Sequence, residues 1–354
     1  MSQQKFKASV TPYAGLKSSC RHIASQEACT DTIRFVVGSS VVGKTNQLQI
    51  IQYDDMQSTI QCMQTLEHAN EVRWITCNPT NEKILFTVSS NPQNRQTLAT
   101  LYKLPEFSAT QDTQKMETIA TFENTPDATR VHYLPNDQTK CLITSKTHLS
   151  VYDINDPSKP ISTKKITDAQ INASAPDPLH PNTFATASED SIKLWDMRDD
   201  KLVYEIQKAH APSVLDISLN ENKPWWICSG GSDGSMKCWD FRVGKVECEF
   251  RASSHWVTRV IPSTSHEQLI LTTGTDSKVR VFNALKFAFQ SEGKLSDGEI
   301  VKSIRHDDSV YCATWATSNP WVFASVSYKG QVNVCQLPSE VVDAILMGDD
   351  SDSN

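Results

Sequence analysis

Apolar and polar residues alternate with a period of two through many short segments of this chain. Valine, isoleucine, threonine and aromatic residues dominate these segments, and small or polar residues such as glycine, serine and asparagine separate them. Successive side chains of a β-strand point to opposite faces, so this alternation predicts a series of short strands. The pattern therefore indicates an all-β protein.

The strand segments repeat along the chain. Seven segments of similar pattern end at residues spaced 43 to 53 positions apart, namely Tyr53, Tyr102, Tyr152, Trp195, Trp239, Phe282 and Cys335. A second alternating segment precedes most of these, as in WWICSGG at 225–231, and a third one further upstream often follows a histidine. Four strands in about 40–45 residues with a Trp-Asp signature are typical of a propeller blade.

On these repeats the chain resembles the WD-repeat β-propeller family over nearly its whole length. The resemblance implies one seven-bladed propeller of four-stranded antiparallel blades within residues 1–338, whose radial repetition leaves only short sheet edges. The segment around 6–13 would close the ring as the outer strand of the blade that ends at Gln336. We expect an insertion loop at about 284–303, between the sixth and seventh blades, and a short helix with an acidic disordered tail at 339–354.

The fifth repeat contains a complete set of polar residues that the WD-repeat family uses to hold a blade together. In that family a loop histidine, a strand serine or threonine, a turn aspartate and a tryptophan form one buried hydrogen-bond chain. The resemblance assigns these positions to His210, Ser229, Asp233 and Trp239. Buried polar groups need partners, so we interpret the set as structural and not as a catalytic triad.

Other repeats keep only part of this set. The retained residues are Thr186, Asp190 and Trp195 in the fourth repeat, His255, Thr272 and Asp276 in the sixth, and His306 and Ser325 in the seventh. Phe282 stands at the tryptophan position of the sixth repeat, and Lys329 and Cys335 replace the aspartate and tryptophan of the seventh. The first three repeats lack the set, so their prediction depends on strand alternation alone.

Residues 38–45, GSSVVGKT, match the phosphate-binding loop G-x-x-x-x-G-K-[S/T] at every position. That loop binds phosphate only between a strand and a helix, because the helix amides and the lysine meet the phosphate together. The segment LQIIQY at 48–53 alternates like a strand. We therefore predict a hairpin turn here, with no nucleotide and no other cofactor.

Charge and cysteine content exclude further classes of function. The chain has 34 basic and 41 acidic side chains, which argues against a general nucleic-acid-binding surface. Its ten cysteines form no C-x-x-C pair and show no metal spacing, so free thiols in a reducing compartment are expected. No apolar run is long enough for a signal peptide or a membrane span, and we expect a cytoplasmic protein without direct membrane insertion.

The last third of the chain narrows the resemblance. SSHWVTRV at 253–260 and NPWVFASVSYKG at 319–330 are similar to WD-repeat proteins that interact with the EARP and GARP vesicle-tethering complexes. The resemblance implies a non-enzymatic adaptor and a monomeric propeller with protein partners. It would support endosomal recycling and retrograde transport from endosomes to the trans-Golgi network, peripheral to both compartments.

Two sets of residues are candidates for partner binding. Trp256, Ser309 and Tyr328 are expected on the face that carries the tetrad loops, although the sequence leaves open whether Trp256 is exposed or packs between blades. The alternative is a substrate receptor of a cullin–RING ubiquitin ligase, whose signature resembles WDMR at 195–198 and WDFR at 239–242. There the last arginine of each segment, Arg198 and Arg242, would contact the ligase adaptor from the opposite face. A simpler interpretation pairs each arginine with a neighbouring carboxylate.

Overall fold

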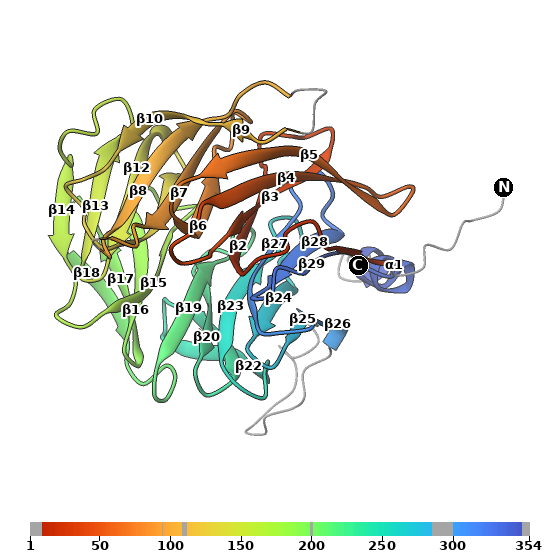
Figure 1. Ribbon diagram of the computed structural model, residues 1–354. Helices are drawn as coiled ribbons and strands as arrows, with labels where there is room; N and C mark the ends of the chain where they lie inside the picture. The colour runs from red at the N-terminus through yellow and green to blue at the C-terminus, as the bar shows by residue number, and fades with distance from the viewer. Residues whose placement is uncertain (1–8, 94, 108–111, 199–200, 285–299, 349–354) are drawn as a thin grey trace.

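Seven antiparallel sheets form a ring in the part of the chain that the structure describes (Figure 1). The structure is a computed structural model, and it describes residues 9–93, 95–107, 112–198, 201–284 and 300–348. Contacts between the first strands of successive sheets run around the whole ring and return from the last sheet to the first. The predicted all-β fold, a seven-bladed propeller, is confirmed.

The blades follow one another along the chain. Blade 1 contains β2 (Cys20–Ser25), β3 (Ile33–Ser39), β4 (Asn46–Asp54) and β5 (Thr59–His68), with the short β9 (Gln114–Lys115) added in parallel to β5. Blade 2 contains β6 (Glu71–Cys77), β7 (Ile84–Ser90), β8 (Thr97–Lys103) and β10 (Glu117–Thr121). Blade 3 contains β11 (Ala128–Leu134), β12 (Asp137–Ser145), β13 (His148–Asp153) and β14 (Ser162–Lys165). Blade 4 contains β15 (Ile171–Pro176), β16 (Thr183–Ser188), β17 (Ser191–Asp196) and β18 (Lys201–Ile206). Blade 5 contains β19 (Val214–Leu219), β20 (Trp226–Gly231), β21 (Ser235–Asp240) and β22 (Lys245–Arg251). Blade 6 contains β23 (Val257–Pro262), β24 (Leu269–Gly274), β25 (Lys278–Asn283) and β26 (Ile300–Arg305).

Blade 7 is built from both ends of the chain. Its strands are β27 (Val310–Trp315), β28 (Val322–Ser327), β29 (Val332–Gln336) and the N-terminal β1 (Val10–Tyr13). β1 pairs antiparallel with β29, from Val10 opposite Cys335 to Tyr13 opposite Val332. In Figure 1 the red N-terminal strands therefore lie beside the blue C-terminal ones. This pairing closes the ring in the way the sequence predicts for residues 10–13, whereas residues 1–8 lie outside the described residues.

The insertion predicted at 284–303 does not lie between blades 6 and 7, and it does not extend to residue 303. β26 pairs with β25, with Ile300 opposite Phe282, so the added segment lies inside blade 6 between its third and fourth strands. Residues 300–303 belong to this outer strand, where one face meets solvent and polar residues are tolerated. Residues 285–299 lie outside the described residues.

The chain after the propeller forms one helix, α1 (Ser339–Gly348), where the sequence predicts it. Ile345 of α1 is buried in a cluster with Trp315 and Leu337 of blade 7 and its exit, so the helix packs onto the propeller. The predicted acidic tail at 349–354 lies outside the described residues.

The antiparallel order of the blades gives the ring two distinct faces. The loops before each first strand and those between second and third strands lie on one side, which we call the top face. The loops between first and second strands lie on the other side, the bottom face. The first strands β2, β6, β11, β15, β19, β23 and β27 all line the central channel.

Every first strand also carries a register shift, which in β19 falls between Val214 and Asp216. The residues just after these seven shifts occupy equivalent positions of the first strands: His22, Trp74, Arg130, Ala173, Asp216, Arg259 and Cys312. Four of them, His22, Trp74, Arg130 and Arg259, line the central channel. One such layer inside a ring brings together residues that lie far apart in the sequence.

Candidate functional site

The polar set of blade 5 forms one connected chain of hydrogen bonds. Asp233 Oδ2 lies 3.0 Å from His210 Nδ1, and His210 Nε2 lies 2.8 Å from Ser229 Oγ. Trp239 Nε1 donates to the same hydroxyl at 2.8 Å. A carboxylate beside Nδ1 favours the tautomer with its proton there, which leaves Nε2 to accept from the serine. Ser235 also belongs to this chain of hydrogen bonds, because its hydroxyl donates to Asp233 Oδ1 at 2.8 Å. The sequence did not predict this role.

Burial separates this set from a catalytic triad. His210 and Ser229 are 1% and 0% exposed, so a substrate cannot reach the hydroxyl or the imidazole. A nucleophile would need an open site within reach of its base. We therefore interpret the tetrad as a structural element that links the loop before β19 to β20 and β21.

The prediction that His255 belongs to such a set is wrong. His255 is exposed, and its Nδ1 lies 2.5 Å from Thr275 Oγ1, away from Thr272. The equivalent position is occupied by Ser253, four residues before the strand start at Val257, which is the spacing of the blade 5 histidine to β19. Spacing to the strand could have excluded His255 before the structure was known.

Asp276, the turn aspartate of blade 6, has an arginine in place of the histidine. Arg280 Nη2 lies 2.6 Å from Asp276 Oδ2, and Arg280 Nη1 donates to the Ala252 carbonyl at 2.7 Å. Thr272 Oγ1 donates to the Arg280 carbonyl at 3.4 Å. Burial opposes ionisation of Asp276, but the arginine and nearby amides outweigh it and lower the pKa of this carboxyl.

The partial sets of blades 4 and 7 occur as pairs. Trp195 Nε1 donates to Thr186 Oγ1 at 2.9 Å, and His306 Nε2 lies 2.9 Å from Ser325 Oγ. Asp190 contributes its backbone, because its carbonyl accepts from the Ala209 amide at 2.7 Å and so ties blade 4 to the loop before blade 5.

Blade 2 holds a pair that the sequence missed. His68 Nε2 lies 3.0 Å from Thr87 Oγ1, in the arrangement seen for the histidine and serine of blade 5. His68 stands four residues before Val72, the same spacing that His210 has to Val214. Blade 2 therefore keeps two members of the set, and the prediction that the first three repeats have none of them is wrong for this blade.

The segment that matches a phosphate-binding loop is a turn between two antiparallel strands. β3 pairs with β4 across it, with Gly38 opposite Leu48, so a strand and not a helix follows Thr45. Asn46 Oδ1 accepts from the Val41 amide at 2.7 Å, and its side-chain amide donates to the Lys44 carbonyl at 2.9 Å. These bonds close the turn on itself, and the helix that would present amides to a phosphate is missing here.

We predict that magnesium-ATP does not bind at this turn. Calorimetric titration is expected to give no binding heat, and thermal unfolding no change in Tm, because no helix N-terminus faces Lys44. The Lys44→Ala variant should behave identically. Saturable binding in the micromolar range that Lys44→Ala abolishes would contradict this prediction.

Exposed aromatic residues gather on the top face where blades 6, 7 and 1 meet. Trp256 is 50% exposed and Tyr328 is 36% exposed, which answers the question that the sequence left open for Trp256. The Arg21 guanidinium lies 5.4 Å from the Tyr311 ring centroid and 5.6 Å from that of Tyr328. Ser309 connects blades 7 and 6, since its carbonyl accepts from the Tyr328 amide at 2.8 Å and its hydroxyl donates to the Thr275 carbonyl at 3.3 Å. We call these five residues the rim patch; Arg21 and Tyr311 were not predicted.

The two Trp-Asp-x-Arg arginines bind their own carboxylates. Arg198 Nη2 lies 2.6 Å from Asp196 Oδ2, and Arg242 Nη2 lies 2.5 Å from Asp240 Oδ2. Each arginine lowers the pKa of the aspartate it binds. Their guanidinium groups remain largely exposed on the bottom face. Each arginine is therefore paired with a neighbouring carboxylate, as the simpler interpretation of the two segments predicts.

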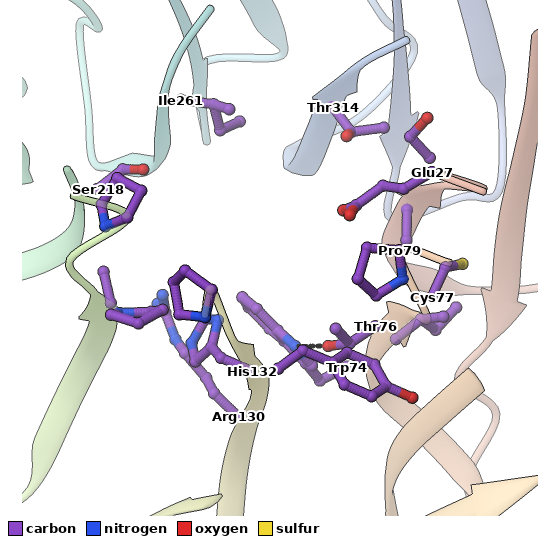
Figure 2. Close-up of a pocket in the computed structure, with 18 of the residues that line it drawn as sticks. Glu27, Trp74, Thr76, Cys77, Pro79, Arg130, His132, Ser218, Ile261 and Thr314 are labelled. Atoms are coloured by element: carbon purple, nitrogen blue, oxygen red, sulfur yellow. Dashed lines mark hydrogen bonds between the residues drawn. The ribbon is translucent and has the colours of Figure 1, made fainter. Parts of the chain in front are cut away.

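A cavity of about 380 Å³ lies in the central channel and is lined by residues of all seven first strands. Its inner end is a buried charged cluster. Arg130 Nη2 lies 2.7 Å from Asp216 Oδ1, and Arg259 Nε lies 3.1 Å from Asp216 Oδ2. Both guanidinium groups lie over the Trp74 ring, each 4.7 Å from its centroid. Figure 2 shows Trp74, Arg130 and His132 together on one side of the open space.

Two histidines beside this cluster have pKa values lowered by burial and by its positive charge. Burial and, after it, the charges of the nearby Arg130 and Arg259 together lower the pKa of His132 to about 3. Burial and the same two arginines also hold the pKa of His22 well below its usual range. Both imidazoles are therefore neutral at physiological pH.

Comparison with known proteins gives the family. A family model described as EIPR1 beta-propeller matches residues 9–282. This chain belongs to the EIPR1 β-propeller family. Membership confirms the resemblance to WD-repeat propellers predicted from the repeats.

Similar proteins cover nearly the whole chain. The chain is 27% identical to EARP and GARP complex-interacting protein 1 of Homo sapiens, over 94% of this chain and 98% of that protein. It is 24% identical to EARP-interacting protein 1 of Caenorhabditis elegans and 26% identical to WD repeat-containing protein DWA2 of Arabidopsis thaliana, each over 90% of this chain and 94% of that protein.

The described residues contain neither a metal-binding cluster nor a membrane-spanning helix. No group of three or more histidine, cysteine or acidic side chains there is arranged to hold a metal ion. Within the same residues, no helix has the length and apolar character needed to cross a membrane. All ten cysteines are free thiols.

Proposed function

We propose that this propeller is a non-enzymatic adaptor that binds vesicle-tethering complexes of the EARP and GARP type. Acting as a cytoplasmic monomer peripheral to endosomes and the trans-Golgi network, it would support endosomal recycling and retrograde transport. The observation that carries the proposal is similarity over 94% of the chain to a protein named for interaction with these complexes. Propellers serve many functions, so the fold alone would not support it.

The rim patch is the surface that we propose for the tethering subunit. Trp256 and Tyr328 are large aromatic side chains with much of their surface in contact with solvent, and such residues dominate binding energy at protein interfaces. Arg21 over the two tyrosine rings adds a cation that an acidic or aromatic partner group can meet. Because the patch spans three blades, a partner could contact it without entering the channel.

The ligase hypothesis uses the opposite face. Arg198 and Arg242 are exposed at equivalent positions of two consecutive blades, which is the observation in its favour. Each is already paired with an aspartate, and an exposed ion pair of this kind contributes little to affinity or stability by itself. The two hypotheses therefore predict that different residues control partner binding.

Changing the rim patch should weaken tether binding. We expect Trp256→Ala with Tyr328→Ala to weaken binding of purified tethering complex about thirtyfold, since losing an aromatic anchor costs about 2 kcal/mol. Affinity is measured by biolayer interferometry, and Tm should stay nearly unchanged because both side chains are exposed. The matched control is Arg198→Ala with Arg242→Ala on the bottom face, which should bind the complex normally.

Three results would contradict parts of this proposal. Normal binding by the rim variant together with lost binding by the bottom-face variant would move the site to the other face. Recovery of a ligase adaptor and no tethering subunit in affinity purification would favour the ligase hypothesis. Binding of no tethering complex by the unaltered protein would refute the adaptor proposal.

A further inference from the structure

The channel cavity has opposite charges at its two ends. At the inner end, Arg130 and Arg259 line the cavity, while Asp216, their shared partner, is 0% exposed and lies behind them. Two guanidinium groups and one carboxylate leave one positive charge uncompensated, since the neighbouring histidines are neutral. A surplus charge away from water is costly unless another charged group approaches it.

Hydrogen bonding at the inner end is also incomplete. Among the described residues, His132 Nε2 is a buried atom without a hydrogen-bond partner. It belongs to the same cavity wall as Arg130 and Trp74 (Figure 2). A buried polar atom in this state is a candidate contact for a ligand, because such atoms are normally satisfied.

The outer end opens on the bottom face and is acidic. Glu27 follows β2 and Glu221 follows β19, and both line the cavity as exposed side chains. Figure 2 shows Glu27 extending from its wall into the open space. Partial desolvation in the cavity and, after it, the charge of Glu221 together raise the pKa of Glu27 to about 7. In the described part of the chain, neither carboxylate has an ion-pair partner.

We propose that this cavity binds a small zwitterion, with a carboxylate of the ligand against Arg130 and Arg259 and its cationic group between Glu27 and Glu221. A volume of about 380 Å³ is within the range of small-molecule sites. The inner guanidinium groups favour a carboxylate, which they can meet with paired hydrogen bonds. Both guanidinium groups lie against the Trp74 ring, which holds them in place. This site is separate from the rim patch and does not depend on the proposed adaptor function.

The two ends together define what the site rejects. A polyanion would meet the carboxylates of Glu27 and Glu221 at the mouth, and a polycation would meet the guanidinium groups inside. Unpaired like charges of this kind cost more than the favourable contact at the other end gains. Selectivity for a ligand with both charges follows from the arrangement of the two ends.

The test uses three probes with the intact protein at pH 8, where Glu27 is ionised. Nα-acetylarginine has a carboxylate and a guanidinium, acetate has only the carboxylate, and N-acetylagmatine has only the guanidinium. Titration calorimetry should show Nα-acetylarginine binding at least about tenfold more tightly than either single-ended probe. Removing an inner arginine would disturb the buried ion pairs, so the variants change the exposed mouth.

Glu27→Gln with Glu221→Gln should weaken binding of Nα-acetylarginine about tenfold and leave acetate binding unchanged or stronger. Glu123→Gln, an exposed carboxylate in the loop before β11 on the top face, is the matched control and should bind like the unaltered protein. Equal binding of acetate and Nα-acetylarginine would overturn the role of the mouth. Equal binding of N-acetylagmatine and Nα-acetylarginine would overturn the role of the arginines. If no probe binds, the charged cluster only holds the blades together and the proposal fails.

Discussion

Replacing Asp216 by alanine is expected to lower the free energy of unfolding by about 3–5 kcal/mol, the largest effect of any single change considered. The aspartate is 0% exposed, and it is the shared partner of Arg130 and Arg259 across the channel. It also accepts from the Val260 amide at 2.9 Å. Without it, two guanidinium groups lose their ion-pair partner and the Val260 amide loses its acceptor, where water cannot fully replace the carboxylate. Urea unfolding followed by circular dichroism measures the change.

A surface pair provides the matched control. Asp137 and Lys140 form an ion pair whose side chains are 38% and 39% exposed, and Asp137→Ala should cost less than about 1 kcal/mol. Replacing Arg259 by methionine together with Asp216→Ala should recover part of the lost stability, since it removes one of the unpaired charges. If Asp216→Ala unfolds at the same urea concentration as the unaltered protein, the cluster does not hold the blades together.

Asp233→Ala should destabilise the propeller by about 1–3 kcal/mol or more. This aspartate accepts from His210 and from the Ser235 amide and hydroxyl, so its loss leaves buried donors without a partner. Asp156 is the matched control, because it accepts from the Ser158 amide in a similar turn but is exposed and has no histidine. Asp156→Ala should therefore change stability much less. An unchanged Tm for Asp233→Ala would remove the tetrad as a source of stability.

The effect of Asp233 should also depend on pH. Burial opposes its ionisation, but the hydrogen bond from His210 and those from the Ser235 amide and hydroxyl outweigh burial and hold the pKa of Asp233 well below its usual range. A pKa lowered by folding contributes stability above the unfolded value of about 4, and this contribution is lost as pH falls towards the folded value. The difference between Asp233→Ala and the unaltered protein should thus be largest near pH 7 and smaller at pH 3. A difference independent of pH would show that the carboxylate charge does not matter.

Much of the architecture could be predicted from local pattern. Most blades are made from consecutive strands joined by short turns, so alternation of period two and its return every 43 to 53 residues are enough to predict the ring. The tetrad of blade 5 was predictable for the same reason, since His210, Ser229, Asp233 and Trp239 lie within thirty positions of one another. His68 and His255 were misjudged because their distance from the next strand was not compared with that of His210.

The channel cluster could not be predicted in this way. Arg130, Asp216 and Arg259 belong to blades 3, 5 and 6, and each is one polar residue within an otherwise ordinary alternating strand. Nothing local distinguishes them from solvent-facing residues, because alternation tells which side chains share a face and not what that face meets. The sequence by itself determined the strands, their order and the bonds within a blade. Only closure of the ring brought the equivalent positions of blades 3, 5 and 6 together beside one narrow channel, where three distant charges become partners and one positive charge remains in excess.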